Sequence, residues 1–257
     1  MTAAQQYTAF ITLARREVVR VLRIWTQTLL PPAITMGIYF IVFGDILGSR
    51  IQNVGSYSYI QYILPGLVLM TTITNSFSNV ATSFFSAKFQ KSIEELLVAP
   101  IPDWLVVSGY VSGGLVRGIL NGLIVMALGR FFTAIPIAHP AVMAAYMLLT
   151  TLLFSLLGMI NGMLARKFDD VGIIPTFFLT PLTYFAGVFY SIQQLPPMWK
   201  QLSLLNPIFY MVDGFRYGFL GIQEASLTWG LSMLIVANVA LWFLSMRLYK
   251  RGIGLRS

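Results

Sequence analysis

Long apolar runs separated by short polar segments dominate this chain. A helix that crosses the hydrocarbon core of a membrane needs about 20 mostly apolar residues. Six runs reach roughly this length, and they occupy residues 24–44, 57–83, 104–130, 141–165, 172–190 and 227–246. The pattern predicts an all-α integral membrane protein, in which residues 1–257 form a single domain with six transmembrane helices.

Residues 5–23, which precede the first run, have a different pattern. Apolar side chains at Phe10, Ala14, Val18 and Val21 recur at three- and four-residue steps, and arginines occupy much of the remainder. A basic amphipathic helix of this kind lies in the membrane interface. It either anchors the topology or connects a cytosolic partner to the first span, and the two roles are compatible.

A second polar segment, KFQKSIEELLVAPIP, covers residues 88–102. Its main apolar residues fall on one face of a helix, and they are Phe89, Ile93, Leu96 and Leu97. Lys91, Glu94 and Glu95 lie mostly off that face. Pro100 ends the helix, because proline disfavours helical geometry in the residue before it. We expect a short amphipathic helix at residues 88–100.

The apolar side of this short helix needs a cover. Lipid headgroups or the protein's own loops are one possibility, and a groove in a soluble partner is the other. The adjacent carboxylates of Glu94 and Glu95 favour the partner, because an anionic membrane leaflet repels them whereas a basic rim on a protein groove attracts them.

Composition supports the membrane assignment and excludes several other classes. Apolar residues make up 57% of the sequence and charged residues 10%, against about 25% charged in soluble domains. The net charge of +8 does not indicate a nucleic-acid partner, because the basic residues are scattered at the ends of apolar runs. With no cysteine and a single histidine, His139, in a short loop, the sequence offers no metal centre.

The placement of lysine and arginine predicts the orientation, because cytoplasmic loops carry an excess of them. With both termini in the cytoplasm, the inner segments hold Arg15, Arg16, Arg20, Arg23, Lys88, Lys91, Arg166, Lys167, Arg247, Lys250, Arg251 and Arg256. The outer segments then hold only Arg50, Arg130, Lys200 and Arg216. This excess predicts cytoplasmic termini and places residues 88–100 on the cytoplasmic side, between the second and third spans.

Polar residues inside the spans are candidates for a translocation path. Arg117 lies within the third span, where a charge is costly and marks either a functional site or a structural contact at a helix interface. Asn75 and Asn79 make the inner end of the second span polar, and they either line the path or join helices. Small-residue spacings in the third span indicate close packing within the subunit, at Gly109, Gly113, Gly114, Gly118 and Gly122.

Aromatic residues crowd the outer end of the fifth span. Tyr184, Phe185, Phe189 and Tyr190 form either an interfacial belt or an exit gate for an amphipathic substrate. Further along, Asp213 and Arg216 are three residues apart, and we expect them to form an ion pair on one helix face.

Two stretches resemble one known family. They are IEELLVAPIP, which follows the second span, and FDDVGIIPTFFLTPLTYFAGVFYSIQQLPPMWKQLSLLNPIFYMVDGFRYGFLG at residues 168–221. Both are similar to segments of ABC-2-type permeases, the membrane subunits of ABC exporters. With the six-span plan and the amphipathic N-terminal helix, the resemblance extends over nearly the whole chain.

The resemblance implies a homodimer of permeases in the bacterial inner membrane, bound to two copies of an ABC ATPase. Residues 88–100 would be the coupling helix seated in the ATPase, residues 5–23 the connecting helix, and residues 191–225 an outer loop with re-entrant helices. ATP and Mg²⁺ would bind the partner, and this chain would hold no cofactor. The substrate class stays open among drugs, lipids, glycolipids and polysaccharides.

The sequence itself is consistent with a separate motor. No G-x-x-x-x-G-K-[ST] loop occurs, so the chain lacks the usual glycine-rich cradle and lysine that bind ATP phosphates. No set of residues predicts a catalytic site, so we do not expect an enzyme. An ATPase-independent secondary transporter or channel is the alternative, but no acidic residue lies in the middle of a span and no internal repeat is visible.

Overall fold

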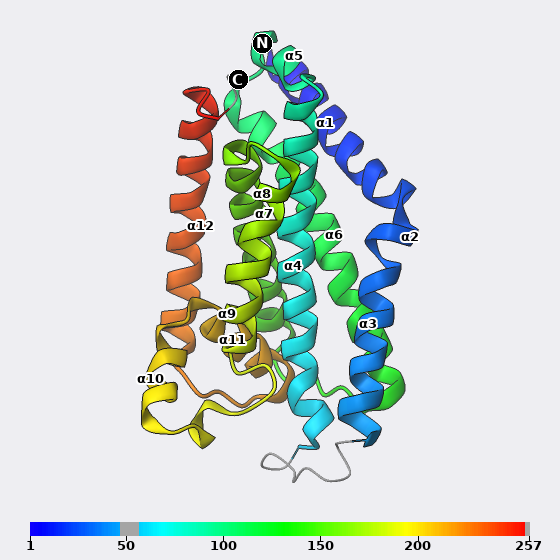
Figure 1. The fold of residues 1–257 in the computed structure, drawn as a ribbon, viewed down its shortest axis with the longest axis vertical. Coiled ribbons are helices and arrows are strands. Elements are labelled where there is room, and N and C mark those ends of the chain that lie inside the picture. The colour runs from blue at the N-terminus through cyan, green and yellow to red at the C-terminus, as the bar shows by residue number, and fades with distance from the viewer. Residues whose placement is uncertain (47–56, 255–257) are drawn as a thin grey trace.

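The computed structural model describes residues 1–46 and 57–254 (Figure 1). The regular elements in these residues are helices. The first four are α1 (Ala3–Arg23), α2 (Trp25–Thr28), α3 (Leu30–Phe40) and the π-helical η1 (Ile41–Ile46). Pro31 and Pro32 lie in the first turn of α3, where a missing N–H leaves no hydrogen bond unmade, so they begin a new helix after the bend.

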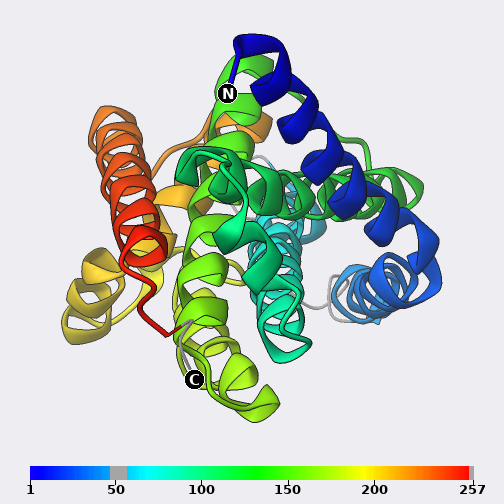
Figure 2. The ribbon, with the colours of Figure 1, turned by 90° about the horizontal axis from the view of Figure 1, so that it is seen from above.

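Three long helices form the centre of the molecule. These are α4 (Tyr59–Phe89), α6 (Asp103–Phe132) and α7 (Pro140–Leu164), and α4 packs along both of the others. Figure 2 shows α3 and α12 (Leu227–Lys250) on opposite sides of this centre. Most residues of α4 are buried, because other helices surround it.

Glycines let these helices approach closely. A methyl group added at Gly109 would lie 2.7 Å from Leu13 on α1, and one at Gly113 would lie 2.8 Å from Glu17. One at Gly118 would lie 2.7 Å from a methyl of Thr151 on α7. The predicted packing of this glycine stripe within the subunit is therefore confirmed.

The predicted fifth span, residues 172–190, is not one regular helix. It begins in α8 (Phe168–Ile174), continues through the π-helical η2 (Pro175–Leu179), and leaves helical geometry after α9 (Thr180–Tyr184). Proline lacks the N–H that a regular helix uses at each interior position, so Pro175 and Pro181 interrupt the α-helical hydrogen bonding.

The segment 191–225 contains the short helices expected there. They are η3 (Ile192–Gln194), α10 (Pro197–Leu205) and α11 (Pro207–Leu220). In α11, most side chains are buried, since the helix packs against α4 and α7. The left-handed Gly221, at φ 70°, ends α11 and turns the chain towards α12.

Among the described residues, four helical segments are long and apolar enough to cross a membrane: Trp25–Gly44, Asp103–Phe132, Pro140–Leu164 and Leu227–Lys250. They coincide with four of the predicted spans. The other two predicted spans correspond to α4, which is mostly buried among other helices, and to the interrupted α8–α9 segment. The count of six spans therefore stays a prediction. The N-terminus, α5 (Ile93–Val98) and the C-terminal end of α12 lie at the same end of the molecule (Figure 1).

Candidate functional site

The predicted helix at residues 88–100 consists of two segments in the structure. Lys88 and Phe89 are the last residues of α4, and α5 begins only at Ile93. Lys91 makes the turn between them with a φ of 60°, in the left-handed region that side-chain-bearing residues rarely adopt. This turn redirects the chain, so Phe89 and Ile93 do not share one helix face.

Ile93 holds α5 to its own subunit. It is 1% exposed and belongs to an apolar cluster with Phe84, Val107 and Tyr110. Burying such a side chain contributes about 1.5–3 kcal/mol. Leu96 packs against the same cluster. Half of the predicted docking face is therefore occupied within this chain.

The end of α4 is fixed against the connection between α7 and α8. The ring of Phe89 lies 5.0 Å from that of Phe168, and the ammonium of Lys88 donates to the carbonyls of Met163 at 3.1 Å and Ala165 at 2.5 Å. Burial lowers the pKa of Lys88, and the nearby Arg166 acts in the same direction. These contacts give α5 a rigid base.

The remainder of α5 has no cover within the described residues. Leu97 is 40% exposed and Val98 is 86% exposed, although both are apolar. Glu94, Glu95, Lys91 and Pro100 are exposed beside them. The face available to a partner thus combines two carboxylates with two aliphatic side chains.

A buried carboxylate that was not predicted from the sequence fixes α1 near this end. Glu17 is 2% exposed; it accepts a 2.6 Å hydrogen bond from Ser83 on α4 and forms ion pairs with Arg16 at 3.2 Å and Arg20 at 3.0 Å. Arg20 also donates to the side chain of Asn79 at 3.1 Å. Because Leu13, Glu17 and Val21 are four residues apart, they share the buried face of α1, and this spacing was the available signal.

Two of the predicted path residues line a groove between α3, α4, α6 and α9. Asn75 and Arg117 both reach it, and its volume is about 440 Å³. Asn79 does not line it, since this side chain is fully buried between α4 and α1. The polar inner half of α4 therefore divides into a groove-lining part and a helix-joining part.

An aromatic cluster lies beside the groove and shares Tyr39 with it. The hydroxyl of Tyr39, a groove-lining residue, lies 3.3 Å from that of Tyr184, and the ring of Tyr184 stacks on Phe189 at 5.7 Å. Phe43 adds a contact to Phe189 at 5.4 Å. The predicted gate residues Tyr184 and Phe189 thus meet α3 and η1.

The other two predicted gate residues lie elsewhere. Phe185 stacks on Trp199 of α10 at 5.9 Å. Tyr190 packs against the main apolar core, and its carbonyl accepts a hydrogen bond from Tyr62 at 3.3 Å. Only half of the predicted set therefore contributes to the aromatic cluster.

The expected ion pair between Asp213 and Arg216 does not form, because each side chain has other partners. Asp213 accepts from the backbone N–H groups of Glu224 at 2.9 Å and Ala225 at 2.9 Å. Arg216 donates to the carbonyls of Gly187 at 2.5 Å and Tyr62 at 3.4 Å, and it lies 4.0 Å from the centre of the Tyr62 ring. Burial raises the pKa of Asp213, and the backbone donors oppose this effect.

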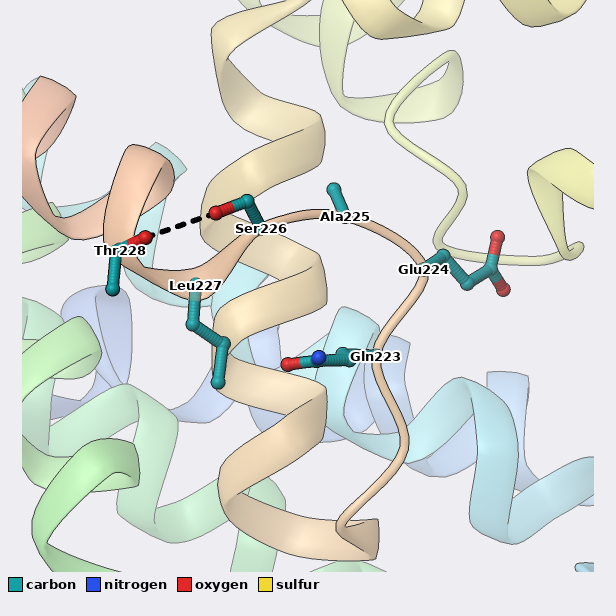
Figure 3. Close-up of a pocket in the computed structure, with 6 residues that line it drawn as sticks. All are labelled: Gln223, Glu224, Ala225, Ser226, Leu227 and Thr228. Atoms are coloured by element: carbon teal, nitrogen blue, oxygen red, sulfur yellow. Dashed lines mark hydrogen bonds between the residues drawn. The ribbon is translucent and has the colours of Figure 1, made fainter.

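Glu224, a second residue not predicted from the sequence, joins this network to the outer loop. In Figure 3 its carboxylate points away from the α11–α12 connection, whereas Ser226 and Thr228 bond to each other at 3.0 Å. The Glu224 carboxylate accepts from Tyr62 at 2.8 Å and from the N–H of Ile192 at 3.0 Å. A single acid in a loop gave no signal for this role, which depends on contacts distant in sequence.

The described residues hold no group of three or more His, Cys, Asp or Glu side chains that could bind a metal ion. The site has instead three parts: α5 with an exposed face, α1 fixed by Glu17, and a groove that Asn75 and Arg117 line beside an aromatic cluster. Such an arrangement can receive a partner at one end and a ligand beside α4.

The chain is similar in sequence to known membrane permeases. The sequence model of the ABC-2 type transporter family matches residues 8–220. The inner membrane transport permease YadH of Escherichia coli is 50% identical over 251 residues, which cover 98% of each chain. Nodulation protein J of Neorhizobium galegae is 24% identical over 215 residues, covering 83% of this chain and 82% of that protein. The chain is therefore a multi-pass transport permease of the inner membrane and belongs to the ABC-2 type transporter family.

Proposed function

We propose that this permease forms the translocation path of an ATP-driven exporter and is powered by a separate ABC ATPase that docks on α5. The observation that carries the proposal is the position of α5, whose exposed face of Glu94, Glu95, Leu97 and Val98 projects from a base fixed by Ile93. A rigidly based helix with one uncovered face suits the helix-in-groove mode of recognition.

The motor and its cofactors belong to the partner in this proposal. The chain has no Walker-type phosphate loop, so ATP and Mg²⁺ bind the ATPase. Two ATPase subunits serve a homodimer of permeases, and α5 transmits their motion to α4 and α6, between which it lies in the chain. The Glu17 contacts carry the same motion to α1, since they join α1 to α4.

The membrane arrangement in this proposal has six spans with both termini in the cytoplasm. Its support is the excess of basic residues on the inner side. Of the residues counted, the outer Arg50 and the inner Arg256 lie outside the described residues. The common location of the N-terminus, α5 and the end of α12 also supports it (Figure 1). Within this arrangement, the groove beside α4 is the path, and drugs, lipids, glycolipids and polysaccharides are the candidate substrates.

Co-purification tests the proposal. The full chain, tagged at its C-terminus and extracted from its native membrane in mild detergent, is expected to retain an ABC ATPase in equal molar amount, and the complex is expected to hydrolyse ATP. An unrelated six-span secondary transporter with the same tag is the control. Ion-driven transport by the purified chain alone, with no ATPase retained, would contradict the proposal and favour a secondary transporter.

A further inference from the structure

Among the residues that the structure describes, Arg117 is a partly buried cation without a partner, and it lines the groove beside α4. It lies near the middle of the 30-residue α6. Within residues 1–46 and 57–254, its guanidinium makes no hydrogen bond or ion pair, and its Nε is buried. Charged side chains inside membrane proteins are costly and normally pair with a group of opposite charge. The structure therefore supplies the cation of a pair but not its anion.

Other hydrogen-bond donors near Arg117 also lack acceptors among the described residues. Arg20 on α1 adds a second positive charge that interacts unfavourably with that of Arg117, and among the described residues its own buried Nε has no acceptor. The amide nitrogen of Asn79 on α4 is also unpartnered. Glu17 is the carboxylate bonded to this region, but it already accepts from Arg16, Arg20 and Ser83. Three helices thus contribute buried N–H groups that lack acceptors.

The space beside Arg117 is suitable for a ligand headgroup. The groove of about 440 Å³ is lined by amide and hydroxyl side chains, which include Gln27, Thr71, Asn75, Ser78 and Thr180. Methionine and proline side chains of α3 and α4 complete it, so a polar headgroup and the start of an apolar chain both find complementary surfaces. Asp and Glu are absent from the described residues that line it, and Arg117 carries its one positive charge.

We propose that this groove binds the phosphate of an anionic amphiphile, and that Arg117 is the residue that holds it. A guanidinium matches a phosphate with two parallel N–H···O bonds, which neutral amides and hydroxyls cannot replace. This inference rests on the proposed exporter function, because it identifies the anionic amphiphile as the exported substrate. The neutral donors around Arg117 then bind the uncharged part of the headgroup.

Binding to the purified full chain in a neutral detergent tests this inference. Dioctanoyl phosphatidylglycerol, titrated calorimetrically, is expected to bind, whereas dioctanoylglycerol, which has the same chains and no phosphate, is expected to bind at least about ten-fold more weakly. The Arg117→Met variant should lose the preference for the phosphate. Equal affinity for the two amphiphiles, or an unchanged preference in Arg117→Met, would overturn the proposal.

Matched variants separate binding from folding. Arg117→Met removes an unpaired charge, so its melting temperature should equal or exceed that of the wild type, and a lower one would mean that Arg117 is a structural contact. Arg117→Lys keeps the charge without the guanidinium fork and should recover part of the affinity. Arg130→Gln, on the exposed last turn of the same helix, should bind like the wild type.

Inorganic phosphate distinguishes the two sources of the anion. If it binds weakly and displaces phosphatidylglycerol only at high concentration, the ligand is a lipid-like headgroup. If it binds as tightly and with the same dependence on Arg117, the site takes a free phosphate. The titration requires no ATPase, so its failure leaves the proposed partnership standing, and failure to co-purify an ATPase leaves the binding result standing.

Discussion

Glu17 is the residue whose removal is expected to have the clearest effect on stability. Glu17→Gln removes the anion between Arg16 and Arg20 and weakens the bond from Ser83. Because both arginines are partly exposed, we expect a loss of about 2 kcal/mol in the free energy of unfolding, seen as a lower melting temperature by tryptophan fluorescence. The exposed Glu94→Gln is the matched control and should melt like the wild type. Equal melting temperatures for the two variants would contradict the account.

Lys91 offers a test of backbone strain at the α4–α5 turn. At φ 60°, a side chain costs about 1 kcal/mol that glycine avoids, so Lys91→Gly should raise the free energy of unfolding by about that amount. Lys91→Ala removes the charge but keeps the β-carbon, so it should give no gain. If alanine stabilises the chain as much as glycine does, the effect comes from the charge and not from the backbone.

Some side-chain contacts were predictable from the sequence and others were not. Arg117 was predictable, because a charge within an apolar run stands out in any sequence. The partners of Asp213 and Arg216 were not, since the backbone groups that they bind belong to Tyr62, Gly187, Glu224 and Ala225. Three-residue spacing places Asp213 and Arg216 close together on one helix. Each side chain is buried and hydrogen-bonds to backbone groups instead of to the other.

At the scale of elements, the two sides of α5 should respond differently to mutation. Ile93→Ala leaves a cavity in the apolar cluster and should cost about 2–5 kcal/mol in the free energy of unfolding. The double variant Leu97→Ser and Val98→Ser changes exposed side chains, so its melting temperature should stay within about 1–2 °C of the wild type. It should, however, weaken ATPase retention in co-purification. Unchanged retention together with unchanged stability would remove these side chains from the docking face.

Close packing of α7 against α4 gives a further prediction. A methyl group at Gly162 would lie 2.8 Å from the carbonyl oxygen of Ala81, which is backbone and cannot move aside cheaply. We therefore expect Gly162→Ala to lower the melting temperature. Gly37→Ala is the matched control, because no atom lies within 4 Å of its added methyl group, and alanine favours helix by up to about 1 kcal/mol. A stabilising Gly162→Ala would mean that α7 lies farther from α4.

Element positions were more predictable than their ends. Helical periodicity correctly predicted α1, where the predicted range 5–23 compares with Ala3–Arg23. For α5 the same periodicity placed the start of the helix too early, at residue 88, which belongs to α4. The turn that separates the two helices depends on a left-handed conformation of Lys91, which a lysine does not predict. Residues 172–190 were predicted as one span, and neither its interruption nor the π-helical stretch Pro175–Leu179 was anticipated.

For the molecule as a whole, the lengths of the apolar runs explain only part of how the helices are arranged. Four predicted spans have the length and composition of membrane-crossing helices, but α4 owes its position to the helices around it rather than to an apolar surface. Its inner half is polar because it faces α1 and the groove. A hydropathy pattern cannot distinguish such a helix from one that contacts lipid, so its central place could not be inferred from the sequence.

We propose that a separate ATPase docks on the acidic, exposed face of α5. The most direct test purifies the full chain with its ATPase and compares the wild type with the double charge reversal Glu94→Lys and Glu95→Lys, in both complex recovery and ATP hydrolysis. Arg130→Glu, at the opposite end of α6, is the charge-reversal control. We predict that the double reversal loses most of the bound ATPase while its melting temperature and the control's recovery stay unchanged. Full recovery of an active complex with the double reversal would contradict the claim.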